Sequence, residues 1–124
     1  MAQVSSAQAP RLARGDLLWI AGLTLGFEIA TCLLRFGFHL ESTRDTSFLA
    51  RLTFGARIHH GYVGTLMLAV GFLLPTDSPA RTWLLRIGSA LALSDLIHHF
   101  LILWPITGSP QFDLTYPPVP PGGR

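Results

Sequence analysis

Two apolar runs, each long enough to cross a lipid bilayer, constrain this chain more than any other feature of its sequence. Residues 17–38 and residues 83–104 are each 22 residues long, and the only charged residues in the first are Glu28 and Arg35. A helix of this length covers about 33 Å, the thickness of a hydrocarbon core. A third apolar run, residues 58–74, is 17 residues long. We therefore expect an all-α polytopic integral membrane protein with three transmembrane helices in an up-down-up bundle.

Composition supports this expectation and excludes other classes of protein. Of the 124 residues, 49% are hydrophobic and only 13% are charged, about half the roughly 25% typical of a soluble domain. Disorder of the whole chain is excluded as well, because it requires low hydrophobicity and high net charge. The basic residues are scattered arginines and the net charge is +2, so the chain lacks the footprint of a nucleic-acid-binding protein.

The chain divides into a bundle and two tails. We expect a flexible N-terminal tail at 1–16, a transmembrane domain at 17–105 whose third helix stops at Pro105, and a Pro-rich C-terminal tail at 106–124 that does not pack. Arginines flank the spans on both sides in similar numbers, so the positive-inside rule does not set the orientation. The lipid bilayer is the expected partner, and the expected location is the inner membrane of a bacterium.

Small residues predict where helices approach one another. Gly64 and Gly71 fall on one stripe of the second helix, where they would let a neighbouring helix come close. Gly22-x-x-x-Gly26 in the first helix matches the motif of closely packed membrane helices. It offers a surface for a homo-oligomer or for a larger membrane complex.

The histidines and acidic residues of the spans carry the functional prediction. An ionisable side chain at the centre of a span costs about 2.5 to 3.5 kcal/mol on insertion scales, so each needs a partner or a purpose. An up-down-up arrangement brings the end of the first helix, the start of the second and the end of the third to the same side. All five histidines then lie in one leaflet, with Asp95 one turn deeper than His99. The five are His39, His59, His60, His98 and His99.

Imidazole and carboxylate are the ligands of zinc, iron and manganese. The unit Asp95-x-x-His98-His99 places a carboxylate and imidazoles on one face of the third helix. We expect a transition metal ion (Fe, Zn or Mn), serving redox or hydrolytic chemistry or metal handling, with first ligands His60, Asp95 and His99. Further ligands, or ligands of a second ion, are expected from His98, His59 and His39. Glu28 and Arg35, seven residues apart on one face, are expected to form a supporting ion pair instead.

Three other interpretations stay open. A b-haem-binding membrane anchor, with His60 and His99 as axial ligands, is similar in length and span count to the small anchor subunits of succinate dehydrogenase, although their serine, arginine and histidine signatures are absent. The histidine-box membrane oxygenases and desaturases are similar in composition, but this chain has no His-x-x-His-His box. A non-catalytic accessory subunit of a larger membrane complex would use its polar stripe only for packing, so enzymatic activity is not established.

Overall fold

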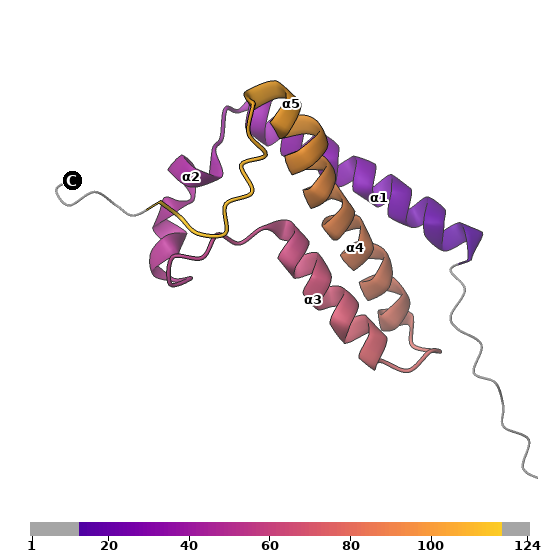
Figure 1. The fold of residues 1–124 in the computed structure, drawn as a ribbon. Coiled ribbons are helices and arrows are strands. Elements are labelled where there is room, and N and C mark those ends of the chain that lie inside the picture. The colour runs from indigo at the N-terminus through magenta and orange to yellow at the C-terminus, as the bar shows by residue number, and fades with distance from the viewer. Residues whose placement is uncertain (1–12, 118–124) are drawn as a thin grey trace, which may run out of the picture.

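The computed structural model describes residues 13–117, and this part of the chain is helical, without a β-strand. Its long helices are α1 (Arg14–Cys32), α3 (His60–Leu73) and α4 (Pro79–Leu96) (Figure 1). Two of them continue as wider π-helical segments, α1 into η1 (Leu33–Gly37) and α4 into η3 (Ile97–Leu103). Short helices complete the set: α2 (Ser42–Asp45), the 3-10 helix η2 (Ser47–Arg51) and α5 (Trp104–Thr107).

Helix α4 lies between α1 and α3 and packs against both (Figure 1). A tight turn joins α3 to α4, in which the amide of Ser78 donates to the carbonyl of Pro75 at 3.1 Å. The two helices therefore run antiparallel. As a result, the start of α3 and the end of α4 lie at the same end of the bundle.

Glycines set the distance between α3 and α4. A Cβ atom added to Gly64 would lie 2.6 Å from the carbonyl oxygen of Gly88 and 2.8 Å from the amide nitrogen of Ala92, closer than real Cβ contacts come. At Gly71 an added Cβ would already touch Leu85 at 3.0 Å. The predicted close approach along the Gly64 and Gly71 stripe is therefore confirmed.

An ion pair ties α1 to α4 at the other end of the bundle. The Nε and Nη2 atoms of Arg86 donate to Oδ1 of Asp16 at 2.9 and 2.7 Å. The same guanidinium lies over the rings of Trp19 and Trp83, which meet edge to face at 5.3 Å. Cation–π and ionic contacts thus anchor the N-terminal part of α1.

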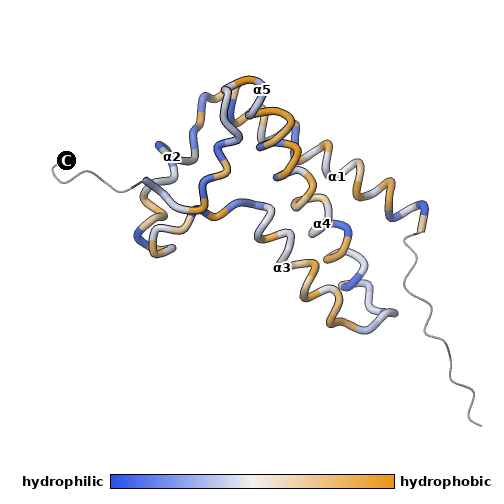
Figure 2. Tube along the Cα trace, in the orientation of Figure 1, coloured by the Kyte–Doolittle hydropathy of each residue, from blue (hydrophilic) through white to orange (hydrophobic). Residues whose placement is uncertain are grey.

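The described residues bury polar side chains and expose large apolar ones. Two helical stretches, Arg14–Gly37 and Pro79–Thr107, are long and apolar enough to cross a membrane, and His60–Leu73 is a shorter apolar helix (Figure 2). The narrower expectation of a bacterial inner membrane has no support in the structure. The buried polar residues are Thr24, Arg57, His59, Ser94, Asp95, His98 and His99, whereas the buried hydrophobic residues are Ile20, Ala90 and Leu103.

The ends of the bundle differ from the predicted boundaries. Helix α1 already begins at Arg14. Pro105 does not stop the last helix, because it lies in the first turn of α5, where a missing amide hydrogen costs little. The helix ends instead at Thr107, and Gly108 caps it with a φ of 77°. The prediction that the C-terminal tail does not pack is wrong for residues 108–117, here called the C-terminal strap. Carbonyls of this segment accept from His99 and His59, and its Asp113 pairs with Arg57. The remaining parts of the predicted tails, 1–12 and 118–124, lie outside the described residues.

Candidate metal centre

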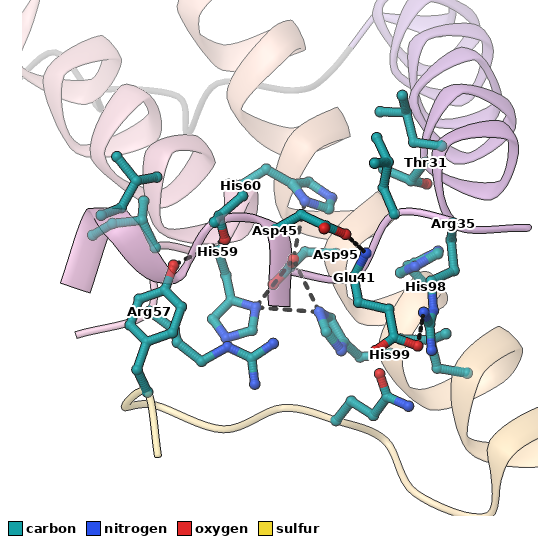
Figure 3. A pocket seen from close by; sticks show the side chains of 18 residues that line it. Thr31, Arg35, Glu41, Asp45, Arg57, His59, His60, Asp95, His98 and His99 are labelled. Atoms are coloured by element: carbon teal, nitrogen blue, oxygen red, sulfur yellow. Dashed lines mark hydrogen bonds and ion pairs between the residues drawn. The ribbon is translucent and has the colours of Figure 1, made fainter. Parts of the chain in front are cut away.

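A pocket of about 370 Å³ opens at the end of the bundle where α3 begins and α4 ends. It is lined by Asp95 and by four histidines, together with residues of the loop after α1 and of the C-terminal strap (Figure 3). The four are His59, His60, His98 and His99. The structure does not bring the fifth, His39, into the pocket: it is exposed, and its carbonyl accepts a hydrogen bond of 2.6 Å from Arg44.

Helix α4 and its π-helical continuation η3 direct polar side chains towards both neighbouring helices. Asp95 and His99, one turn apart, meet residues at the start of α3. Ser94 and His98, also one turn apart, meet Glu28 on α1 instead. The rings of the two adjacent histidines are accordingly almost perpendicular, at 87°.

Four polar atoms converge at the α3 side of the pocket. Nδ1 of His59 lies 3.2 Å from Nε2 of His99, and these atoms lie 3.9 and 3.7 Å from Oδ1 of Asp95. Nδ1 of His60 lies 3.2 Å from the same Oδ1. The residues whose ligand atoms all lie within 4.8 Å of one another are His59, Asp95 and His99, and all three are buried. We call these three residues the His59–Asp95–His99 cluster.

Backbone carbonyls of the C-terminal strap determine which imidazole nitrogens carry hydrogen. Nδ1 of His99 lies 2.7 Å from the carbonyl oxygen of Pro110, and Nε2 of His59 lies 3.1 Å from that of Asp113. A carbonyl oxygen only accepts, so these nitrogens donate. In the neutral rings, Nδ1 of His59 and Nε2 of His99 therefore present lone pairs to each other.

The third atom of the cluster is an acceptor as well. Oδ1 of Asp95 is buried and has no hydrogen-bond donor among the described residues. With both imidazoles neutral, three lone-pair-bearing atoms thus face one another in a buried place. Positive charge relieves their repulsion, supplied either by a metal ion among the three atoms or by a proton shared between the two imidazoles.

The spacing suits a metal ion. Ligand atoms bound tetrahedrally at about 2.0 to 2.1 Å lie roughly 3.4 Å apart, and the observed separations of 3.2, 3.7 and 3.9 Å bracket this value. Metal-binding histidines usually donate their other N–H group to a carbonyl or carboxylate, as both imidazoles do here. The cluster can therefore hold a metal ion.

Residues whose side chains are not candidate metal ligands also shape the site. A Cβ atom added to Gly61 would lie 2.6 Å from Oδ2 of Asp95, so only glycine leaves room for this carboxylate. The ring of Phe112 stacks on His59 with centroids 4.6 Å apart. Arg57, itself buried, pairs with Asp113 at 2.9 Å and fixes the strap.

The predicted first ligands were His60, Asp95 and His99, and all three line the pocket. His59 rather than His60 nevertheless joins Asp95 and His99 in the group whose ligand atoms all lie within 4.8 Å of one another. His59 precedes α3 with extended backbone angles, φ −86° and ψ 144°, and its ring turns inward, whereas His60 is the first residue of the helix. Nδ1 of His60 lies 3.2 Å from Oδ1 of Asp95, so this imidazole is placed to act as a further ligand.

The predicted ion pair between Glu28 and Arg35 is wrong. Arg35 pairs with Glu41 at 2.7 Å, and Glu28 accepts from His98 at 2.8 Å. Glu28 and Arg35 are seven positions apart along the helix, about 10.5 Å of rise, and each has a nearer partner on another segment.

The partner of Arg35 lies at the rim of the pocket. The hydrogen bond and charge of Arg35 hold the pKa of Glu41 below its usual range. The rim of the pocket therefore carries an ion pair of opposite charges at this point.

Sequence reasoning missed Gly61, Phe112 and the two carbonyl groups of the C-terminal strap. A backbone carbonyl leaves no trace in a sequence, and one glycine among many carried no signal of its own. No family model, no curated protein and no solved structure matches the chain.

Proposed function

We propose that this chain is a small membrane protein that crosses the bilayer three times and holds one transition metal ion, iron, zinc or manganese, in the His59–Asp95–His99 cluster. The observation that carries the proposal is the convergence of two buried imidazole nitrogens, whose rings donate their other N–H groups to carbonyls of the C-terminal strap, on a buried carboxylate oxygen without a hydrogen-bond partner among the described residues. A cation bound to Nδ1 of His59, Nε2 of His99 and Oδ1 of Asp95 relieves the repulsion among these atoms. His60 is the nearest additional ligand, through its Nδ1 atom 3.2 Å from the carboxylate.

The membrane part of the proposal follows from the distribution of polarity. The surfaces of α1 and α3 carry exposed leucine, isoleucine and phenylalanine side chains, whereas the ionisable groups gather inside. Lipid favours this arrangement, because it tolerates apolar surface and penalises unpartnered polar groups. With 14 residues, α3 extends about 21 Å, so its passage requires a bilayer that is locally thinner than the average of about 30 Å.

Two imidazoles and one carboxylate leave positions of the metal open. Such donor sets are typical of non-haem iron sites, and three protein ligands with an open position are typical of catalytic zinc. When bound, the metal supplies a Lewis acid or a redox centre at the wall of the pocket. The side chains of Thr31, Arg35 and Tyr116 line the same pocket, and the space beside the cluster suits water or a small ligand.

A b haem between His60 and His99 fits the site less well. Oδ1 of Asp95 lies 3.2 Å from Nδ1 of His60 and 3.7 Å from Nε2 of His99. A carboxylate oxygen thus sits where a haem iron and its ring would have to lie. A role within a larger complex is compatible with metal binding, since Gly22 and Gly26 have nothing within 4 Å of an added Cβ and leave this face of α1 open to a partner.

Metal analysis of purified protein and matched variants tests the proposal. Wild type, reconstituted with Zn²⁺ in detergent and freed of excess metal, is expected to retain an ion that Asp95→Asn and His99→Ala lose. Asp95→Asn is the cleaner variant, because its amide can donate to an imidazole lone pair and so preserve the fold. His39→Ala is the control, since it removes an exposed histidine outside the pocket. Equal zinc content in Asp95→Asn, His99→Ala and wild type would overturn the proposal.

A further inference from the structure

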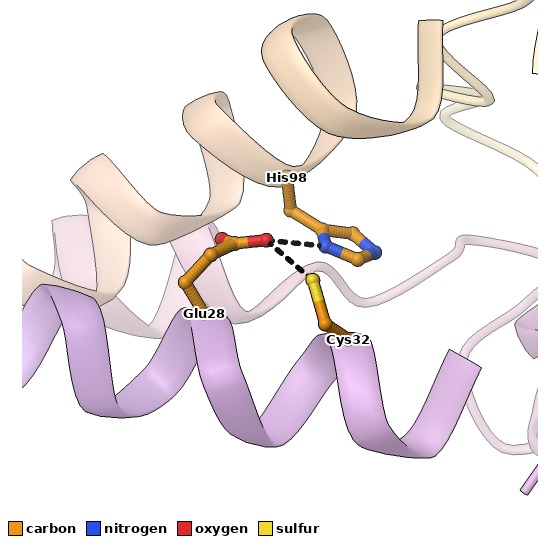
Figure 4. Close-up of side chains that lie close together, drawn as sticks. All are labelled: Glu28, Cys32 and His98. Atoms are coloured by element: carbon orange, nitrogen blue, oxygen red, sulfur yellow. Dashed lines mark hydrogen bonds and ion pairs between the residues drawn. The ribbon is translucent and has the colours of Figure 1, made fainter. Parts of the chain in front are cut away.

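A second group of ligand atoms lies on the other side of α4. Glu28 and Cys32, one turn apart on α1, point at His98 (Figure 4). Oε1 of Glu28 lies 2.8 Å from Nδ1 of His98 and 3.3 Å from Sγ of Cys32. The three ligand atoms all lie within 4.8 Å of one another. Ser94 adds a hydrogen bond of 3.3 Å to the second oxygen of the carboxylate.

We propose that Glu28, Cys32 and His98 form a second metal site, selective for a thiophilic divalent cation such as Zn²⁺. Thiolate, imidazole and carboxylate are all established zinc ligands, and a thiolate favours soft or borderline metals over magnesium or calcium. The donor set thus differs from that of the His59–Asp95–His99 cluster, which has no sulfur.

Charge balance supports this assignment. The carboxylate of Glu28 and the imidazole of His98 are largely buried, with 13% and 9% of their side-chain surfaces exposed. A divalent ion bound to one carboxylate, one thiolate and a neutral imidazole has zero net charge, the state least penalised in an apolar interior. Helix α1 can contribute two ligands from one face because residues four apart are neighbours on its surface.

Binding requires two proton movements. The hydrogen on Sγ of Cys32 leaves to solvent as the metal–sulfur bond forms. The imidazole of His98, whose Nδ1 now faces the carboxylate, binds through Nδ1 and carries its hydrogen on Nε2. One proton is thus released for each ion bound, and Glu28 exchanges hydrogen-bond donors for the metal.

Co²⁺ is the appropriate probe, because a cobalt–thiolate bond produces a charge-transfer absorption in the near ultraviolet that nitrogen and oxygen ligands do not. The chain contains a single cysteine, so such a band reports Cys32 alone. Titration of the full chain in detergent is expected to bind two equivalents of Co²⁺ and to produce the band with one of them.

Variants separate the two sites. Cys32→Ser, whose hydroxyl can still donate to Glu28, is expected to lose the band and one equivalent. Glu28→Gln is expected to weaken the band-forming equivalent by at least about tenfold. Asp95→Asn is expected to keep the band and lose the other equivalent. The inference is overturned if wild type saturated with Co²⁺ shows no thiolate band, or if the band persists with equal affinity in both Glu28→Gln and His98→Ala.

Discussion

Gly61→Ala tests whether the contact between α3 and α4 positions the Asp95 carboxylate. The new Cβ atom would lie 2.6 Å from Oδ2 of Asp95 and 2.9 Å from its Cβ and Cγ atoms. Asp95 is fixed to α4, so either the helices move apart or the carboxylate turns away. Overpacking of this kind costs about 1 to 3 kcal/mol in the free energy of unfolding. Displacement of a ligand-bearing group is also expected to weaken metal binding by about 10- to 100-fold.

Gly15→Ala is the matched control for this substitution. Gly15 is the second residue of α1, as Gly61 is of α3, and an added Cβ there has nothing within 4 Å. Both variants gain similar helix propensity, so the difference between them isolates the steric effect. Thermal unfolding in detergent gives the stability, and metal titration gives the affinity. Equal stability and equal metal affinity for the two alanine variants would refute the argument.

Three further predictions concern the metal, the C-terminal strap and the rim of the pocket. A chelator is expected to lower the unfolding temperature of wild type more than that of Asp95→Asn, because wild type loses a bound metal ion. A ligand at 100 times its dissociation constant stabilises the folded state by about 2.7 kcal/mol. Equal shifts in unfolding temperature for the two proteins would contradict a metal in the His59–Asp95–His99 cluster. Phe112→Ala removes the ring stacked on His59, and a stacked aromatic pair contributes about 0.5 to 1.5 kcal/mol to stability. The variant is expected to speed amide hydrogen exchange in residues 108–117. Unchanged exchange would show that other contacts hold the C-terminal strap. Because Arg35 lowers the pKa of Glu41, this pair stabilises the folded chain above the pKa of the unfolded state and loses its effect as the pH falls through the lower, folded value. Glu41→Gln is therefore expected to flatten the loss of stability on acidification, measured as unfolding temperature between about pH 3 and 6, and an unchanged profile would count against the pair.

Apolar length and glycine spacing were sufficient to predict the helices and their closest contact. The stripe of Gly64 and Gly71 identified the packed face of α3, because small residues are what permits backbones to approach. The boundary at Pro105 was predicted wrongly, since proline is unfavourable inside a helix but acceptable in the first turn after a π-helical segment.

The gathering of histidines around Asp95 followed from connectivity, whereas the order of the ligands did not. Helix direction alone brings the start of α3 to the end of α4. Which of His59 and His60 turns inward depends on the backbone angles of one residue before a helix. The contribution of the C-terminal strap was hidden for another reason: its carbonyls act through the main chain, and proline-rich sequence resembles an unpacked tail.

The pairing of Glu28 shows a further limit of reasoning from one helix at a time. Its spacing from Arg35 indicated a partner on the same face, but the structure gives each residue a closer partner on another segment. Competition between segments is decided by tertiary packing, which the periodicity of one helix does not contain.

Anomalous diffraction from crystals of the zinc-loaded protein, collected at the absorption edge of zinc, shows whether a metal ion lies in the His59–Asp95–His99 cluster. We predict an anomalous peak about 2.0 to 2.2 Å from Nδ1 of His59, Nε2 of His99 and a carboxylate oxygen of Asp95. Crystals of the zinc-loaded protein with no peak among these three atoms, or with water hydrogen-bonded between them instead, would contradict it.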